Sequence, residues 1–229
     1  MNTVIRLKDV ELFFKVSRAI NNGKYQALNR VNIELKEGDR LGIVGSNGSG
    51  KSTLLRILAG IYPPQKGSVW RDPSKTIALL SLGLGFQLEL TGRENALLAA
   101  MLQGTNRKDA EEALGQIHEF TELGDFFDQK VKSYSAGMRS RLGFATGLLL
   151  DTDVLLLDEI LAVGDADFRL KAERALANKL SPDKTVVLVH HMERPIRAIC
   201  ERAVWIDKGS IVADGPTANV LDAYAASIK

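Results

Sequence analysis

Short apolar stretches of strand length dominate the first third of the chain, and polar turns such as Asn21-Asn22-Gly23 separate them. Apolar stretches of this length, bounded by turn residues, are typical of β-strands. The pattern returns after the helix breaker Pro63-Pro64. The predicted strands are residues 4–7, 31–35, 40–44, 68–71 and 76–80.

The apolar positions change to helical spacing near residue 90. Thr91-Gly92-Arg93-Glu94 has the sequence of a capping box, in which the first and fourth side chains cap each other's backbone N–H groups. We predict helices from there through Met101, over 108–121 and over 135–150.

Strand and helix signals alternate in the remainder of the chain. The predicted elements are strands 154–157 and 185–189, helices 168–180 and 194–200, and two strands joined at Lys208-Gly209 as a hairpin. This order predicts an α/β fold with a β-rich N-terminal part and an inserted helical part.

Residues 45–52, Gly-Ser-Asn-Gly-Ser-Gly-Lys-Ser, match the phosphate-binding pattern G-x-x-x-x-G-K-[S/T] between a strand-like and a helix-like stretch. The glycines let backbone N–H groups converge on phosphate oxygens, and the helix adds its positive N-terminal end. We expect Lys51 to reach the β- and γ-phosphates and Ser52 to ligate Mg²⁺. The sequence therefore predicts a P-loop core that binds a nucleoside triphosphate. The predicted loop residues are Gly45, Ser46, Asn47, Gly48, Ser49, Gly50, Lys51, Ser52 and Thr53.

A second signal of a nucleotide site lies at Val154 to Leu157, an apolar run that Asp158 and Glu159 follow. Such a run is typical of a parallel strand buried on both faces, and ligands bind at the carboxyl end of such strands. Asp158 is expected to hold Mg²⁺ through its hydration shell, and Glu159 to polarise the attacking water and accept its proton. The alternative, a pair of surface acids, is disfavoured by the phosphate loop upstream.

Composition excludes several classes of protein. The chain has 229 residues, with 30 Lys plus Arg against 28 Asp plus Glu, so no basic field indicates a nucleic-acid partner. No apolar stretch approaches the roughly 18 residues that span a bilayer, and we expect no signal peptide. The one cysteine, Cys200, excludes an internal disulfide and indicates a reducing compartment. Any membrane role is expected to come through a partner.

Ser135-Ala136-Gly137-Met138 resembles the signature motif of ATP-binding-cassette (ABC) ATPases, whose usual form is Ser-Gly-Gly-Gln. A helix that begins at Ser135 directs its N–H groups and positive end outward, which suits a second contact with a γ-phosphate. The resemblance implies that Ser135 and Gly137 of one subunit close over ATP bound by another. Ala136 and Met138 depart from the usual form, and their effect on turnover stays open.

Further positions resemble the same family in the expected order, over essentially the whole chain. By this resemblance Gln87 contacts Mg²⁺ and the attacking water, Asp165 crosses between subunits, His191 senses the γ-phosphate and Phe14 stacks on adenine. Two alternatives stay open: a helix-capping role for Asp165, and Phe13 as the stacking aromatic. The implied catalytic residues are Glu159, His191 and Gln87, and the implied metal contacts are Ser52, Gln87 and Asp158.

The resemblance also implies a division of the chain. We expect one domain over residues 1–229, with a nucleotide-binding core at about 1–88 and 151–229 and a helical subdomain at about 89–150 that carries the signature motif.

Three parts of the sequence, 82–95, 134–142 and 162–165, resemble the ATPases that export bacterial surface polysaccharides. Those proteins energise export of capsular polysaccharide, O-antigen or teichoic acid. Some carry a C-terminal carbohydrate-binding domain; since this chain ends at Lys229, the short form is expected.

The resemblance implies an ATPase that uses ATP and Mg²⁺ at the cytoplasmic face of the inner membrane. The implied partners are a two-copy integral-membrane permease and a second copy of this chain in a head-to-tail homodimer, with lipid-linked polysaccharide handled indirectly. The alternatives are the ATPase of a lipid or drug exporter and, less well supported, an ABC switch without transport. A P-loop kinase is disfavoured, because it would need an Arg-rich lid where this chain is apolar and helical.

Overall fold

The computed structural model describes residues 2–17, 23–80, 85–149, 152–158, 164–180, 184–190 and 192–227. The chain forms two compact units, and each is described by itself. The first unit comprises Met1–Lys75, Val154–Asp158 and Pro182–Lys229, and the second comprises Thr76–Asp153 and Glu159–Ser181. The second unit therefore also contains a strand before the helical stretch 89–150 and a helix after it. The assignment of the whole chain to one domain stays a prediction.

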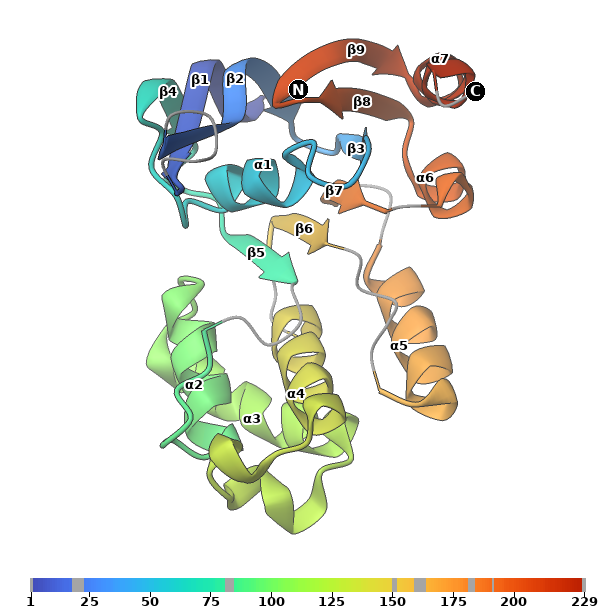
Figure 1. Ribbon diagram of the computed structural model, residues 1–229. Coiled ribbons are helices and arrows are strands. Elements are labelled where there is room, and N and C mark those ends of the chain that lie inside the picture. The colour runs from blue at the N-terminus through green and yellow to red at the C-terminus, as the bar shows by residue number, and fades with distance from the viewer. Residues whose placement is uncertain are drawn as a thin grey trace. The chain divides into compact units, whose positions relative to one another are not determined.

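The first unit contains two sheets (Figure 1). One is antiparallel in the order β2-β1-β4; in the other, β6, β7, β3 and β8 run parallel in that order and β9 pairs antiparallel with β8. Its strands are β1 (Thr3–Lys15), β2 (Lys24–Lys36), β3 (Arg40–Val44), β4 (Lys66–Arg71), β6 (Val154–Asp158), β7 (Thr185–Val189), β8 (Arg202–Asp207) and β9 (Ser210–Pro216). Its helices are α1 (Lys51–Leu58), α6 (Glu193–Ile199) and α7 (Thr217–Ser227).

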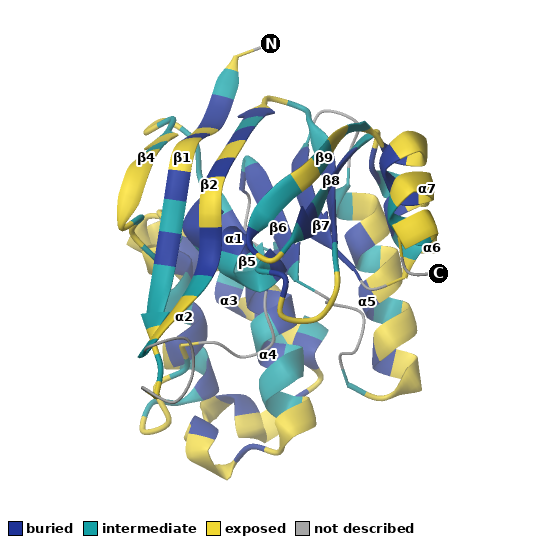
Figure 2. Cartoon of the chain, turned by 45° about the horizontal axis from the view of Figure 1, so that its top comes forward, coloured by how far each residue is buried: buried dark blue, intermediate teal, exposed yellow. Residues whose placement is uncertain are grey.

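The parallel strands are buried in the way that their continuous apolar sequence predicts. Every residue of β7 is buried, and so are the first four residues of β6, which Figure 2 shows in dark blue. At about 25 cal/mol per Å² of apolar surface, this burial is a main source of stability for the sheet. The predicted strand at 154–157 is confirmed as a buried parallel strand whose carboxyl end carries Asp158.

Strands β1 and β2 are longer than the strands that we predict from their apolar stretches. Their register shifts near Asp9 and Arg30, which adopt φ of 49° and 46°. Such shifts mark β-bulges, where an extra residue breaks the alternation of side chains between the two faces. The polar residues there interrupted the apolar pattern, so the sequence indicated only part of each strand.

The second unit is mainly helical. Its helix α2 begins with the predicted capping box, because the Thr91 side chain accepts from the Glu94 N–H and the Glu94 carboxylate accepts from the Thr91 N–H. Phe127 is fully buried in a core shared with residues such as Ile117 and Leu142. The elements are β5 (Ile77–Leu80), α2 (Gly92–Leu102), α3 (Arg107–Thr121), η2 (Gly124–Asp128), η3 (Val131–Ser133), α4 (Ala136–Leu149) and α5 (Ala166–Lys179).

No helix within the described ranges has both the length and the apolar character needed to cross a bilayer.

The predicted hairpin at Lys208-Gly209 is confirmed. Both residues have positive φ, 44° and 78°, as the turn of a two-residue hairpin requires. The turn packs against β2: the Asn29 N–H donates to the Gly209 carbonyl at 2.8 Å, and a Cβ on Gly209 would lie 2.7 Å from the Ala27 carbonyl oxygen. Glycine is needed at 209 because both the backbone angle and the close approach of β2 exclude a side chain.

We predict that Gly209→Ala lowers the free energy of unfolding by about 1–3 kcal/mol, because alanine is strained at this φ and its Cβ collides with β2. Urea denaturation of the purified protein measures the change. Gly215→Ala is the matched control: it lies in β9, and a Cβ there meets nothing within 4 Å. Its stability should stay within about 0.5 kcal/mol of the wild type. Equal effects of the two substitutions would contradict the prediction.

Candidate nucleotide-binding site

The phosphate loop connects β3 to α1 in the first unit. β3 is buried beyond Arg40 and ends at Val44, and α1 begins at Lys51 after Gly50, which adopts φ of 112° as the N-cap. The described first turn of α1 contains no acidic residue, so no carboxylate of that turn neutralises the positive N-terminal end of the helix. The loop therefore has the strand–loop–helix context that binds phosphate.

The β8–β9 hairpin supports the loop from one side. The Gly209 N–H donates to the Ser49 carbonyl at 2.9 Å. A Cβ on Gly45 would collide with the Ile206 carbonyl oxygen, and one on Gly50 would lie 2.6 Å from the Ala27 carbonyl oxygen. These two glycines are thus required by close backbone packing beneath the loop.

Gly48 differs from the other two glycines of the loop. Its φ is 78°, it is exposed, and a Cβ there would meet nothing within 4 Å. The buried Ser49 Oγ has no hydrogen-bond partner among the described residues. A loop that is packed on one side and open on the other, with a free hydroxyl, fits a polyphosphate, whose oxygens accept N–H and O–H donors.

Lys51 already points back over the loop. Its side chain is 8 % exposed, and its Nζ donates to the carbonyls of Gly45 at 2.8 Å and Ser46 at 2.9 Å. These bonds hold the ammonium group against the backbone of the phosphate loop, where the sequence analysis expects it to contact phosphate. An anionic phosphate competes well for it, because hydrogen bonds between charged groups are about twice as strong as neutral ones.

Ser52 and Asp158 lie together at the end of β6. The Ser52 Oγ donates to Asp158 Oδ1 at 3.3 Å, although 106 residues separate them. A hydroxyl and a carboxylate side by side, next to a phosphate loop, are the protein oxygens that a phosphate-bound Mg²⁺ uses. The pairing joins the two motifs that the sequence identified separately.

Two of the predicted catalytic residues, Glu159 and His191, lie outside the described residues, so their roles stay predictions. The neighbour His190 is 5 % exposed at the end of β7, and its Nδ1 accepts from the Met192 N–H at 3.0 Å.

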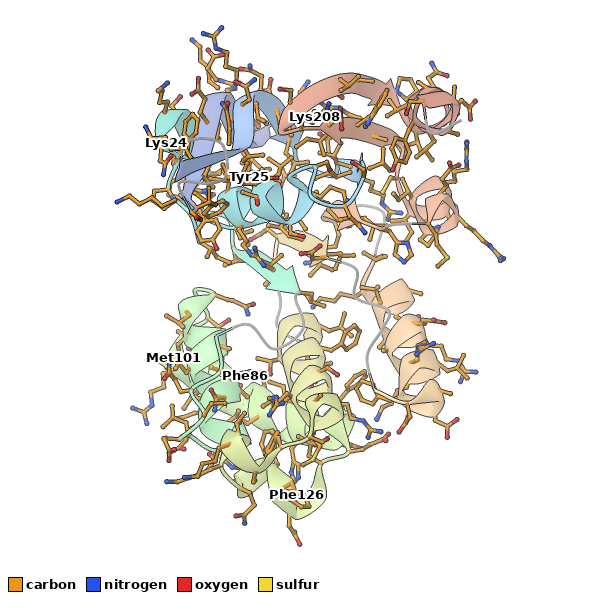
Figure 3. All side chains as sticks on the ribbon, in the orientation of Figure 1. Lys24, Tyr25, Phe86, Met101, Phe126 and Lys208 are labelled. Atoms are coloured by element: carbon orange, nitrogen blue, oxygen red, sulfur yellow. The ribbon has the colours of Figure 1, made fainter. Side chains whose placement is uncertain are left out.

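One aromatic residue that contacts the loop is Tyr25, which the sequence analysis did not identify; the stacking of Phe14 or Phe13 on adenine stays a prediction. Figure 3 labels the Tyr25 side chain. Its hydroxyl donates to the Gly48 carbonyl at 2.8 Å. Tyr25 is paired with Phe14 across the β1–β2 ladder, but the Phe14 ring packs edge-on against Tyr62, 5.8 Å between centroids. Phe13 lies under the Lys66 ammonium group. No local pattern marks Tyr25, because it reaches the loop through the packing of β2 against Gly50 and the β8–β9 turn, which are distant in sequence.

The signature residues belong to the second unit. Ser135 caps α4, since its Oγ accepts from the Met138 N–H at 3.2 Å. Gly137 is exposed in the first turn, and a Cβ there would meet only the Ser135 Oγ, at 3.8 Å. These residues line a cavity of about 360 Å³ with Phe126, Arg141 and Asp165. The helix N-terminus therefore opens onto a hollow that both Ser135 and Asp165 border.

Asp165 is the N-cap of α5, as the alternative interpretation expected. Its carboxylate accepts from the Phe168 N–H at 3.0 Å and forms an ion pair with Arg141 at 2.5 Å. The Phe168 N–H, and after it Arg141, hold the pKa of Asp165 below its usual value. Arg141 also pairs with Glu122 at the end of α3, so the signature helix is linked both to α3 and to the start of α5. The contact of Asp165 with a second subunit stays a prediction.

Gln87 lies in the second unit at the start of a turn that leads into α2. Its backbone N–H donates to the Asn95 Oδ1 at 2.8 Å, and its carbonyl accepts from the Leu90 N–H at 3.1 Å. The structure thus brings the loop residues, Ser52 and Asp158 together in the first unit, and Ser135, Gly137 and Asp165 together in the second. Gln87 belongs to the second unit with the signature.

We predict that Tyr25→Phe weakens ATP binding about 2- to 10-fold, because the net value of one hydrogen bond is about 0.5–1.5 kcal/mol and this one orients the phosphate loop. Titration of the purified protein with a fluorescent ATP analogue measures the dissociation constant. The matched control is Tyr224→Phe, because Tyr224 packs on Trp205 in the same unit and not on the loop. Unchanged affinity in Tyr25→Phe would show that the bond does not orient the loop.

The comparisons with known proteins agree with this geometry. The family model described as ABC transporter matches residues 28–162, which include the phosphate loop, the signature residues and Asp158. The solved ATP-binding cassette MJ0796, in a dimeric state bound to ADP and Pi, superposes with a TM-score of 0.74 and covers 93% of this chain and 98% of its own. At 24% identity, this likeness shows the fold alone. The predicted P-loop fold of the ABC type is confirmed.

Relatives of higher identity extend over most of the chain. The O-antigen export system ATP-binding protein RfbB of Klebsiella pneumoniae is 36% identical over 217 residues, covering 93% of this chain and 88% of the relative. The teichoic acids export ATP-binding protein TagH of Lactiplantibacillus plantarum is 36% identical over 212 residues; the chain spans 58% of its length. The matched family model and these relatives together show that the chain belongs to the ABC transporter family, whose ATP-binding proteins are ATPases.

Proposed function

We propose that this chain is the ATP-hydrolysing subunit of an ABC exporter of a bacterial cell-surface polysaccharide. The observation that carries the proposal is the placement of Lys51, Ser52 and Asp158 around one phosphate loop. This group of side chains provides the positive charge, the hydroxyl and the carboxylate that Mg-ATP requires.

Each residue has a distinct part in hydrolysis. The loop N–H groups and Lys51 bind the phosphates and stabilise the charge that develops on them. Mg²⁺, when bound, neutralises phosphate charge, and Ser52 and Asp158 are the protein groups that would hold it. Glu159 accepts the proton of the attacking water, and His191 and Gln87 orient the γ-phosphate and that water.

ATP acts in this proposal as a ligand between two copies of the chain. Each copy carries one phosphate loop and one signature segment, and the signature residues Ser135 and Gly137 border an open cavity. Two copies arranged head to tail would therefore form two complete sites. ATP binds the closed dimer more tightly than the open state, and this difference in binding free energy is what favours closure. Hydrolysis removes that difference.

The relatives support polysaccharide as the cargo. Their names specify export of O-antigen and teichoic acids, and the identity extends over 93% of this chain. An integral-membrane permease in two copies would supply the pathway, with the ATPase bound to its cytoplasmic side. Export of a lipid or a drug is the second candidate. The same ATP site would serve it, but the names of these relatives do not support it.

We predict that Glu159→Gln lowers ATP turnover by about 10²-fold or more and leaves ATP affinity within a few-fold of the wild type, as expected for loss of a general base. Phosphate release and nucleotide titration measure the two quantities. Glu173→Gln, on the exposed side of α5, removes a carboxylate of the same kind and should change neither. Near-normal turnover in Glu159→Gln would remove Glu159 from the role of base.

The same variant tests the cargo in cells. In a strain that lacks its own copy, the wild-type chain with its permease should restore a polysaccharide on the cell surface, and Glu159→Gln should leave the glycan inside. Surface labelling with a lectin or antibody detects it. Active ATPase without any effect on surface glycan would contradict polysaccharide export and favour another cargo.

A further inference from the structure

Asn95 is a buried polar side chain in the second unit, in the first turns of α2. It is 2 % exposed, and asparagine is seldom so deeply buried unless its amide is fully bonded. Its four partners are all backbone atoms of the segment before it, residues 87–91. Asn95 therefore acts on the turn that carries Gln87.

The bonds of Asn95 use both ends of its amide. Its Oδ1 accepts from the Gln87 N–H at 2.8 Å. Its Nδ2 donates to the carbonyls of Gln87 at 3.0 Å, Leu90 at 3.3 Å and Thr91 at 2.9 Å. Both backbone polar groups of Gln87 are thus bonded to one side chain of α2.

A second segment of the unit crosses the same turn. The Val131 N–H donates to the Leu90 carbonyl at 2.9 Å, the Lys132 N–H donates to the Leu88 carbonyl at 3.0 Å, and Thr91 and Lys130 form an antiparallel bridge. This segment leads directly to Tyr134 and the signature residue Ser135.

Tyr134 continues the connection from that segment to α2. It is 4 % exposed, and its hydroxyl donates to the Phe126 carbonyl at 2.6 Å. The ring lies against Gly92 so closely that a Cβ on Gly92 would collide with the hydroxyl. Asn95, Gly92 and Tyr134 therefore connect Gln87 to the start of the signature helix α4 within the one unit.

We propose that Asn95 is a positioning residue that fixes the Gln87 backbone on α2, so that Gln87 and the signature segment move as one body. The proposal rests on the proposed ATPase function, in which Gln87 orients the attacking water. Asn95 lies in a helix and its side chain forms these hydrogen bonds with backbone atoms, so its role is to set the position of Gln87. A displacement of about 1 Å at such a position costs up to roughly 100-fold in rate.

Asn95→Asp is the sharpest test, because aspartate keeps the shape of the side chain and the oxygen that accepts from the Gln87 N–H. It replaces the Nδ2 donor with a carboxylate oxygen, which would then face three backbone carbonyls. We expect kcat for ATP hydrolysis to fall about 10- to 100-fold, with KM for Mg-ATP within about threefold of the wild type. Asn95→Ala should show the same division between kcat and KM.

Thr121→Val is the matched control for a general loss of stability. Thr121 is also fully buried in the second unit, but its hydroxyl donates only to the His118 carbonyl of its own helix, at 2.7 Å. We expect Thr121→Val to lower the melting temperature without the specific fall in kcat. If kcat fell as far in Thr121→Val as in Asn95→Asp, or if both Asn95 variants lost ATP binding, Asn95 would have a general structural role and the proposal would be overturned.

Amide hydrogen exchange of the full-length protein gives a readout that does not depend on activity. The amides of Gln87 and Leu90 should exchange at least about tenfold faster in Asn95→Ala, which removes the acceptor of the Gln87 N–H, than in the wild type, and no faster in Thr121→Val. Unchanged exchange there, or unchanged kcat in folded Asn95→Asp, would overturn the proposal. If the wild-type chain hydrolysed no ATP, the proposed function would fail, and the exchange data alone would still decide whether Asn95 fixes Gln87.

Discussion

A phosphate loop binds its ligand tightly only when its backbone N–H groups already point to one place before the ligand arrives. In this chain the loop from Gly45 to Gly50 is held by close backbone packing on the β8–β9 hairpin and on β2. That packing leaves no room for side chains at Gly45 and Gly50, while Gly48 faces open space. The position of Lys51 and of the N-terminus of α1 follows from this arrangement. The nucleotide site therefore depends on contacts between β-strands far apart in sequence.

The second unit is built around a different constraint. Its helices present the N-terminus of α4 at an open cavity, and ion pairs hold that end in place. Arg141 pairs with Asp165 and Glu122, and Lys171 also pairs with Glu122. Surface ion pairs are each worth little, but a network around one guanidinium group also fixes geometry. The signature residues and Asp165 are thus held together on one surface of the second unit, which in the proposed dimer would meet ATP bound by a second copy.

The motifs of the site were predictable from sequence because each depends on a short stretch of chain. The loop at 45–52, the buried strand before Asp158, the capping box at Thr91 and the hairpin at Lys208-Gly209 all have local patterns. Tyr25 and Asn95 have none: Tyr25 reaches the loop through the packing of β2 on Gly50 and the β8–β9 turn, and Asn95 is distinguished only by burial. The full lengths of β1 and β2 were also missed, because polar residues at their bulges break the alternation.

The central claim is that ATP joins two copies of this chain through the phosphate loop of one and the signature segment of the other. The most direct measurement is the molar mass of purified Glu159→Gln protein by light scattering, in saturating Mg-ATP and in Mg-ADP. The account predicts a dimer with Mg-ATP and a monomer with Mg-ADP, and loss of the dimer when Ser135→Arg is added to fill the signature cavity. A protein that binds Mg-ATP yet stays monomeric, alone and with its permease, would contradict the account.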